Sequence, residues 1–241
     1  MSHLEDLLKQ ATNPIAYNAP DTEWVIENGK DSSRQNIYRE YFLPYRNEWL
    51  DKDVLDIGSG AGWLLNFFMH NGARSVKGIE PSQKNVEASK TLYPNADVAN
   101  EDFITVELTE KFDLITAVMV VPNLLNLELA FGKFKSLMDD EAILMVVVPD
   151  YDYFKTPRHG YGLDMATINT SEYVIEVRRP TVVLTDIVRK NEVYIAAAKT
   201  AGLNCLDSIP MIPSGAFTEQ LPQYQEFKQQ PIMHLLRFKK V

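Results

Sequence analysis

The run VLDIGSGAG, residues 54–62, is the strongest indication of the fold in this sequence. Its apolar start predicts a short buried strand over 53–57, and an apolar helix is predicted to follow over 62–70. The glycines at 58, 60 and 62 carry no side chains, so backbone N–H groups stay open to a ligand that approaches the turn. A tight turn without a ligand would also account for three glycines. The residues at the ends of the neighbouring strands are therefore needed to distinguish a ligand site from a purely structural turn.

Outward from this turn, strands and helices alternate as far as residue 149. β-branched and apolar runs predict further strands over 75–79, 96–100, 112–119 and 142–148, with helices over 82–92 and 127–138. This alternation is typical of βαβ units with right-handed crossovers in a parallel sheet. We therefore predict an α/β fold of the doubly wound kind.

The flanks of this core differ in pattern. Aromatic residues at three- and four-residue steps predict a helix over 33–49, and 150–170 is predicted to be a loop or lid. Extended segments over 173–178 and 181–187, a helix over 192–201 and closing strands over 204–209 and 232–239 follow. We expect one domain over 1–241, made of an N-terminal cap for substrate (1–50), a cofactor-binding core (51–149), a lid-like insertion (150–189) and a C-terminal helix with closing strands (190–241).

Composition excludes several classes of protein. The 241 residues include 45% hydrophobic and 24% charged residues, as in ordinary globular domains, and no apolar run is long enough to span a bilayer. A net charge of −9 disfavours nucleic acid as a partner. The single cysteine, Cys205, and a start without the pattern of a secretory signal predict a cytoplasmic protein, with no membrane partner.

Two acidic residues identify the ligand more closely. Glu80 ends the second predicted strand, 22 residues after Gly58, where a carboxylate can accept both hydroxyls of a ribose. Asp102 follows the third strand, where it can meet an adenine amine. The rival is a nicotinamide dinucleotide site, which needs a glycine at position 63, and that position is Trp63.

From about residue 38 onward the chain resembles the class I, Rossmann-like methyltransferases that use S-adenosylmethionine. Residues 54–62 are similar to the first motif of that superfamily, Ile79-Glu80-Pro81-Ser82 to its acidic ribose loop, and Phe112-Asp113-Leu114-Ile115-Thr116-Ala117 to its fourth-strand motif. The resemblance is to the small-molecule branch. It implies a seven-stranded sheet in the order 3-2-1-4-5-7-6 with the last strand antiparallel.

The resemblance also implies roles for individual residues. Asp56 and the three glycines would surround the methionine part of the cofactor, Glu80 the ribose, and Asp102 with Phe103 the adenine. Met119 would lie near the sulfonium. Further cofactor-binding candidates are Ser59, Trp63, Pro81, Tyr17 and Arg34.

Two positions depart from the family pattern. Asn123 stands where the small-molecule branch often has a histidine after the fourth strand, and Asp139-Asp140-Glu141-Ala142 replaces a Pro-Gly-Gly turn before the fifth. Methyl transfer needs a base only when the nucleophile keeps its proton, so alignment of the reactants can supply most of the catalysis. The catalytic candidates are His159, Asp150 and Asn123, and no spacing of ligands predicts a metal site.

We predict an enzyme that transfers a methyl group from S-adenosylmethionine to an oxygen or nitrogen of a small molecule. A protein or peptide methyltransferase and a non-catalytic S-adenosylmethionine-binding module remain the alternatives. The sequence identifies neither the methyl acceptor nor the oligomeric state.

Overall fold

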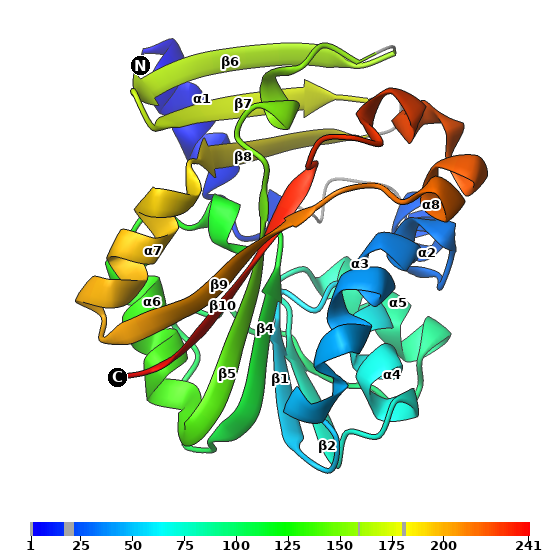
Figure 1. The fold of residues 1–241 in the computed structure, drawn as a ribbon, viewed down its shortest axis with the longest axis vertical. Coiled ribbons are helices and arrows are strands. Elements are labelled where there is room, and N and C mark those ends of the chain that lie inside the picture. Colours follow the sequence, from blue (N-terminus) through cyan, green and yellow to red (C-terminus); the bar gives the residue numbers. More distant parts are fainter. Residues whose placement is uncertain (1, 17–21, 159, 180–181) are drawn as a thin grey trace.

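The computed structural model describes residues 2–16, 22–158, 160–179 and 182–241. A seven-stranded sheet forms the centre, with the order β3-β2-β1-β4-β5-β10-β9 (Figure 1). Its strands are β1 (Asp53–Ile57), β2 (Ser75–Ile79), β3 (Asp97–Ala99), β4 (Phe112–Val118), β5 (Met138–Pro149), β9 (Leu203–Met211) and β10 (Met233–Lys240).

Strand β10 runs in the opposite direction to the other strands of this sheet. It pairs antiparallel with β5 and with β9, whereas the pairs of β1 with β2 and β4, β2 with β3 and β4 with β5 are parallel. Counted within the central sheet alone, this is the order 3-2-1-4-5-7-6 with the last strand antiparallel. The predicted fold class is confirmed.

Successive side chains of the central strands point to opposite faces, and each face is covered by helices. Leu55, Ile115 and Leu144 pack on one side together with helices α6 and α7, while Val54, Leu114 and Met145 pack on the other with α3 and α4. Figure 1 shows the two helical layers on either side of the sheet. The helices are α3 (Asn36–Phe42), α4 (Trp63–His70), α5 (Gln83–Leu92), α6 (Leu127–Leu137) and α7 (Asn191–Thr200).

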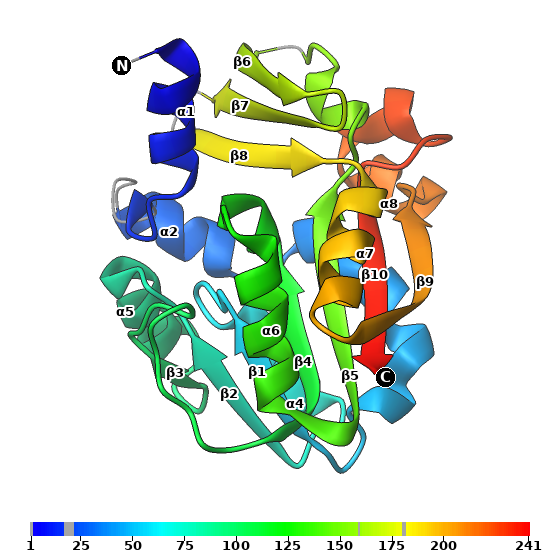
Figure 2. The same cartoon turned by 90° about the vertical axis from the view of Figure 1, so that its left-hand side faces the viewer.

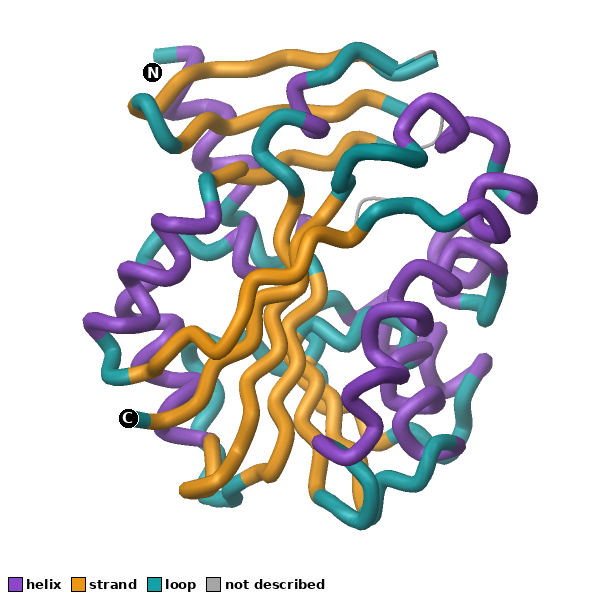
Figure 3. Tube along the Cα trace, in the orientation of Figure 1, coloured by secondary structure: helices purple, strands orange, loops and turns teal. Residues whose placement is uncertain are grey.

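A second, three-stranded antiparallel sheet lies beyond the carboxyl ends of β4 and β5, as the strand colouring of Figure 3 shows. It consists of β6 (Gly162–Asn169), β7 (Glu172–Arg178) and β8 (Val183–Arg189). We call it the lid sheet. Helix α1 (His3–Ala11) packs on one of its faces through Leu7 and Ala11 against Val174 and Ile187 (Figure 2).

The prediction of a loop over 150–170 was wrong for its second half. From Met165 onward the side chains of β6 alternate between exposed and partly buried, and the partly buried Ala166 and Ile168 pack with residues of α1. The strand therefore has no continuous apolar run from which it could have been predicted. The substituted turn at 139–142 is part of β5, where the exposed residues Asp139, Asp140 and Glu141 bulge out of register with β4.

Short helical elements complete the chain. The helix expected over 33–49 is divided into a 3-10 turn (Ser33–Gln35), α3 and a second 3-10 segment (Leu43–Glu48) that includes Pro44. Helices α2 (Thr22–Gly29) and α8 (Gly215–Gln220) and the 3-10 turns Val121–Asn123, Tyr153–Lys155 and Pro222–Phe227 lie in segments for which no helix was predicted.

No helix in the described part of the chain is both long and apolar enough to cross a membrane.

Candidate active site

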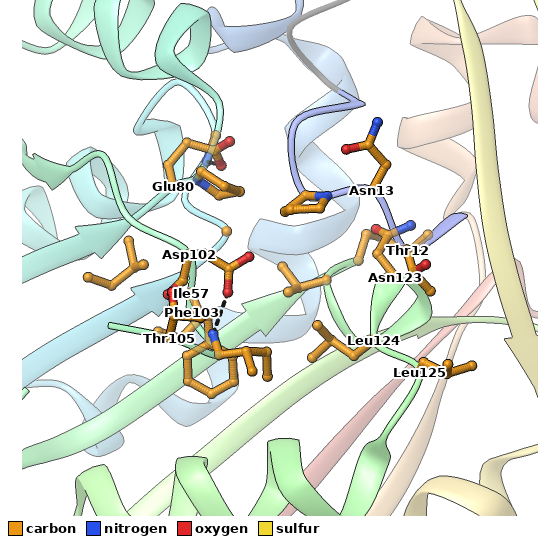
Figure 4. Close-up of a pocket in the computed structure, with 18 of the residues that line it drawn as sticks. Thr12, Asn13, Ile57, Glu80, Asp102, Phe103, Thr105, Asn123, Leu124 and Leu125 are labelled. Atoms are coloured by element: carbon orange, nitrogen blue, oxygen red, sulfur yellow. Dashed lines mark hydrogen bonds between the residues drawn. The ribbon is translucent and has the colours of Figure 1, made fainter. Parts of the chain in front are cut away.

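A cavity of about 560 Å³ opens at the carboxyl ends of β1, β2 and β4, where the strand order reverses. This is the edge at which open α/β sheets bind ligands. The residues that line it come from five segments: Thr12, Asn13 and Pro14; Ile57, Gly58 and Gly60; Ile79, Glu80, Pro81 and Asn85; Asp102, Phe103, Ile104 and Thr105; Val118, Met119, Val120, Asn123, Leu124, Leu125, Asn126 and Leu129. Figure 4 shows Glu80 and Asp102 across this space from Asn13 and Asn123.

The glycine turn between β1 and α4 forms the floor. Gly58 has a φ of 66° and Gly60 a φ of 54°, a conformation that favours glycine. A Cβ on Gly58 would lie 2.2 Å from Cγ2 of Val120, whereas a Cβ on Gly60 would meet no heavy atom within 4 Å. Gly58 therefore lets β4 approach the turn, and Gly60 leaves room for a ligand.

Glu80 is buried beside this turn, with 5% of its surface exposed. Its Oε2 accepts the backbone N–H of Gly60 at 2.9 Å, and its Oε1 accepts the N–H of Ser82 at 2.9 Å and Nδ2 of Asn85 at 3.1 Å. Burial raises the pKa of Glu80, and these three hydrogen bonds counteract part of that rise. The carboxylate is thus held in one orientation at the cavity wall.

Asp56 lies behind the turn and does not line the cavity. It is 2% exposed, and its Oδ1 accepts the hydroxyl of Thr116 at 2.6 Å. Burial raises its pKa to about 7, the hydrogen bond from Thr116 lowers it, and the charge of Glu80 raises it further.

Asp102 and Phe103 line the wall opposite Asn13. Oδ1 of Asp102 accepts the N–H of Ile104 at 2.7 Å, which closes the turn after β3 (Figure 4). Phe103 stacks on Phe134 of α6 with ring centroids 4.5 Å apart. The pair offers an apolar surface with a carboxylate beside it.

Met119 follows β4 with a φ of 58°, which is unusual for a residue with a side chain. Its N–H bonds to the carbonyl of Val147 at 2.9 Å, so the neighbouring strand β5 holds this backbone in place. Left-handed backbone of this kind is often found at functional sites. Met119 lines the cavity, as does Pro81.

Several other residues that were predicted to bind the cofactor do not line the cavity. Trp63 packs in the aromatic layer of α3 and α4, with its ring 5.7 Å from that of Phe67, and does not line the cavity. Arg34 donates to Oδ1 of Asn28 at 2.6 Å. Ser59 and Gly62 belong to the turn but not to the lining, and Gly62 is the N-cap of α4. Tyr17 and His159 are outside the described residues.

Asn123 joins three elements at the far end of the cavity. Its Nδ2 lies 3.0 Å from the carbonyl of Ala11 in α1, 3.1 Å from that of Thr185 in β8 and 3.2 Å from Oδ1 of Asp186. The side chain therefore ties the end of β4 to the lid sheet and to α1 while it lines the cavity.

The carboxylate of Asp150 is occupied by contacts with the turn that follows it and with β10. Its Oδ1 accepts the N–H groups of Asp152 at 3.0 Å and Tyr153 at 2.7 Å, and its Oδ2 lies 2.9 Å from Nε2 of His234. Burial raises its pKa, but the contacts with His234 and Tyr153 lower it more, so the pKa lies below its usual range.

Asp186 was not predicted as a site residue. It lies on β8 opposite Ile175, on the face of the lid sheet that carries Tyr173, Val177 and Val188 rather than α1. It is 5% exposed, and burial raises its pKa to about 6 although Asn123 and Arg179 lower it. No sequence pattern around Asp186 indicated a functional residue, because the residues that contact it are distant in sequence and are brought to it only by the lid sheet.

Asp186 contacts Asn123 but does not itself line the cavity. Thr12, Asn13 and Pro14 do line it and were not predicted, because α1 brings them there from the distant N-terminus. Across the described ranges, no group of three or more His, Cys, Asp and Glu side chains is arranged to hold a metal ion.

Comparison with known proteins agrees with this geometry. A family model described as a methyltransferase domain matches residues 32–183. Among curated proteins, the chain is 25% identical over 126 residues to a putative methyltransferase of Invertebrate iridescent virus 6 (51% of this chain, 47% of the relative). It is 29% identical to protein arginine N-methyltransferase 6 of Danio rerio (56% and 45%) and 31% identical to a ubiquinone biosynthesis O-methyltransferase of Rhodopseudomonas palustris (39% and 38%).

The chain thus spans half the length or less of these curated relatives. Among solved structures, the CcbJ methyltransferase of Streptomyces caelestis matches with a TM-score of 0.65 at 12% identity over 95% of this chain and 99% of that chain. The glycopeptide N-methyltransferase MtfA in complex with S-adenosyl-L-homocysteine matches with a TM-score of 0.64 at 10% identity (86% and 90%). These two similarities show the fold.

The fold and the cavity at its topological switch point define a class I, Rossmann-like methyltransferase domain. The chain belongs to the methyltransferase domain family, and S-adenosylmethionine is the cofactor of this class.

Proposed function

We propose that this chain transfers a methyl group from S-adenosylmethionine to an oxygen or nitrogen atom of a small molecule. The observation that carries the proposal is the cover over one end of the cavity, where the side chain of Asn123 joins the core to α1 and the lid sheet. A covered site admits a small acceptor more readily than a folded protein chain.

The cavity fits the cofactor. Gly60 leaves open space at the turn, and the volume of about 560 Å³ is within the range of small-molecule and cofactor sites. When bound, S-adenosylmethionine would supply a methyl group attached to a sulfonium sulfur. The neutral thioether that remains after transfer is a good leaving group. We propose that the turn at Gly58 and Gly60 accepts the methionine part.

The other contacts that we propose with the cofactor involve residues of the same cavity wall. We propose that Glu80, held by Gly60 and Ser82, accepts the ribose hydroxyls, with Pro81 beside them. Asp102 and the ring of Phe103 would hold the adenine, and Met119 would lie towards the sulfonium. Asp56 would act from behind the turn as a negative charge near the amino group of the cofactor.

We propose Asp186 as the group that takes the proton from the acceptor. A base is most effective when its pKa lies near the working pH, and burial raises the pKa of Asp186 to about 6. Asn123 would orient its Oδ1. Asp150 is less suited to this role because His234 and two backbone N–H groups already occupy its carboxylate.

The alternative of a protein or peptide acceptor remains, since the relatives include both an arginine N-methyltransferase and an O-methyltransferase. The experiment that separates the two incubates the protein with methyl-labelled S-adenosylmethionine and either a pool of low-mass cell metabolites or the protein fraction of the same lysate. Label in the low-mass pool, lost in Asp186→Asn, supports the proposal. Label confined to the protein fraction contradicts it.

We also propose a cytoplasmic site of action without a nucleic-acid partner. The single cysteine and the net charge of −9 support this. Fractionation of cells that express the tagged protein tests the location.

A further inference from the structure

Arg158, in the loop before β6, and Arg179, directly after β7, lie near one end of the lid sheet, and the side chain of Arg179 is exposed. Among the residues that the structure describes, neither forms an ion pair, whereas Arg39, Arg74, Arg178, Arg189 and Arg237 all do. Arg34 and Arg46 also form no ion pair within the described ranges, but they donate to Asn28 and to the carbonyl of Asn71. The chain carries 33 acidic and 24 basic residues, so a carboxylate would be easy to supply. Arginines without carboxylate partners in so acidic a protein therefore need an explanation.

Aromatic rings hold the two guanidinium groups instead. Cζ of Arg158 lies 4.7 Å from the ring centroid of Tyr153 and 5.5 Å from that of Tyr161. Cζ of Arg179 lies 5.1 Å from the centroid of the same Tyr161 ring. Both cations thus flank one ring, and cation–π contacts of this kind position the side chain without using its N–H donors.

Arg158 forms a side-chain hydrogen bond with Tyr153, but another of its donors has no acceptor among the described residues. Its Nε is buried and has no hydrogen-bond partner in the described part of the chain. A buried donor without an acceptor costs free energy, about 1–3 kcal/mol in typical cases. A ligand with acceptor oxygens would remove that cost.

Tyrosines from separate elements lie within reach of the charge of Arg179. The charge of Arg179 acts on Tyr38 of α3, on Tyr153 of the turn after β5 and on Tyr224 of the 3-10 turn Pro222–Phe227. Burial is the main cause that raises the pKa of Tyr38 and of Tyr224, each to about 12, so both hydroxyls stay protonated and can donate hydrogen bonds.

Arg179 also acts on the residue proposed as the base. Its charge lowers the pKa of Asp186, whose Oδ1 is bonded to Asn123 at the end of the cofactor cavity. Arginine forks match the oxygens of carboxylates and phosphates.

We propose that Arg158 and Arg179 form a clamp for an anionic group, a carboxylate or a phosphate, on the methyl acceptor. This inference rests on the proposed small-molecule function and names its substrate class. The anionic end of the acceptor binds the N–H edges of the two guanidinium groups that lie against Tyr161, the tyrosine rings pack against its body, and the nucleophile reaches towards Asp186.

The test uses probes of similar shape and different charge. The full chain, saturated with S-adenosylhomocysteine, is titrated by calorimetry with 4-hydroxybenzoate, phenyl phosphate, neutral 4-hydroxybenzamide and cationic 4-hydroxybenzylamine. We expect at least one of the two anions to bind at least about tenfold more tightly than the neutral amide, because a charged hydrogen bond is worth that much. The comparison of the two anions distinguishes carboxylate from phosphate.

The chain offers a matched control for the variants. Arg158→Gln and Arg179→Gln should each weaken binding of the anion by about tenfold or more and leave that of the amide unchanged, and Arg179→Lys should restore part of the loss. Arg178→Gln should change nothing, because Arg178 is exposed and already pairs with Glu176 and Asp164. Thermal melts of each variant check folding.

Two results would overturn the clamp: no saturable binding of either anion at millimolar concentration, or anion binding that both glutamine variants leave unaltered. Failure of the small-molecule function gives a different pattern. In that case the anions still bind and depend on Arg158 and Arg179, but methyl label enters only the protein fraction.

Discussion

Asn123, five residues after the end of the fourth strand of the central sheet, donates its side-chain amide to Asp186 on the lid sheet, 3.2 Å away. The same Nδ2 lies within 3.1 Å of the carbonyls of Ala11 and Thr185. One amide therefore connects the core, the lid sheet and α1 at the far end of the cofactor cavity. The position that often holds a histidine in the small-molecule branch here holds the residue that fastens the lid.

Asn123→Ala should loosen this connection. Two carbonyl groups and a carboxylate lose a donor, and each unsatisfied group costs about 1–3 kcal/mol, so we expect the variant to be less stable by roughly 2–4 kcal/mol. Hydrogen exchange should show the loss of protection mainly in α1 and β6–β8. Asn191→Ala, which removes only the exposed bond to Ser208, serves as the control. Equal loss of protection throughout the central sheet would argue against a local fastening role.

Glu80→Ala should weaken cofactor binding. The proposed ribose contacts are charged hydrogen bonds, worth about 1.5–3 kcal/mol, which corresponds to roughly a 10- to 150-fold loss of affinity. Calorimetry with S-adenosylhomocysteine measures this directly. Glu87→Ala changes an exposed carboxylate on α5 and should bind as the wild type does. Unchanged affinity in Glu80→Ala would refute the ribose assignment.

The elements that bury both faces were the easiest to predict from sequence. β1 and β2 have the bounds that their apolar runs predict, 53–57 and 75–79. α1 and β6 gave no comparable pattern, because each is stabilised through one face only, by the other and by the rest of the lid sheet. Their structure depends on contacts between residues about 160 positions apart, such as His3 with Asp164.

The same distinction applies to the site. Gly58, Glu80, Asp102 and Met119 follow strands whose ends meet at one edge, so their common location at the cavity could be predicted. Asp186 contacts the cavity residue Asn123 from the lid sheet, and the residues at 12–14 reach the cavity after α1; no local pattern specifies either placement. Trp63 was chosen from its place next to the glycine turn, but its side chain points into the aromatic layer with Tyr38 and Phe67.

Asp56→Asn should make stability less dependent on pH. Burial raises the pKa of Asp56 to about 7, so the folded state keeps a proton that the unfolded chain, with a pKa of about 3.9, releases. The carboxyl therefore costs no stability below about pH 4 and an increasing amount as the pH rises towards 7. The variant should gain on the wild type across that window, by up to about 4 kcal/mol. Urea unfolding at several pH values measures the difference, and a difference that does not change with pH would contradict the buried-carboxyl explanation.

Asp150→Asn should show the opposite pH dependence. The pKa of Asp150 is lowered, because the contacts with His234 and Tyr153 outweigh burial, so its contribution to stability is present above the unfolded pKa and is lost as the pH falls through the folded value. We expect the variant to lose about 1–3 kcal/mol at pH 7 and to approach the wild type in acid. If Asp150→Asn instead kept full stability and lost methyl transfer, Asp150 would be the base after all.

The glycine turn itself allows a graded test. Gly58→Ala combines a left-handed backbone with a Cβ 2.2 Å from Val120, so we expect a loss of several kcal/mol, since strain of about 1–2 kcal/mol adds to overpacking of about 1–3 kcal/mol. Gly60→Ala has the same kind of backbone but open space around the Cβ, so it should lose only the strain of about 1–2 kcal/mol and still weaken binding of S-adenosylhomocysteine. Gly132→Ala in α6 has neither problem and should gain about 1 kcal/mol from helix propensity. Urea denaturation ranks the three variants, and a Gly58→Ala protein as stable as Gly60→Ala would show that β4 does not press against the turn.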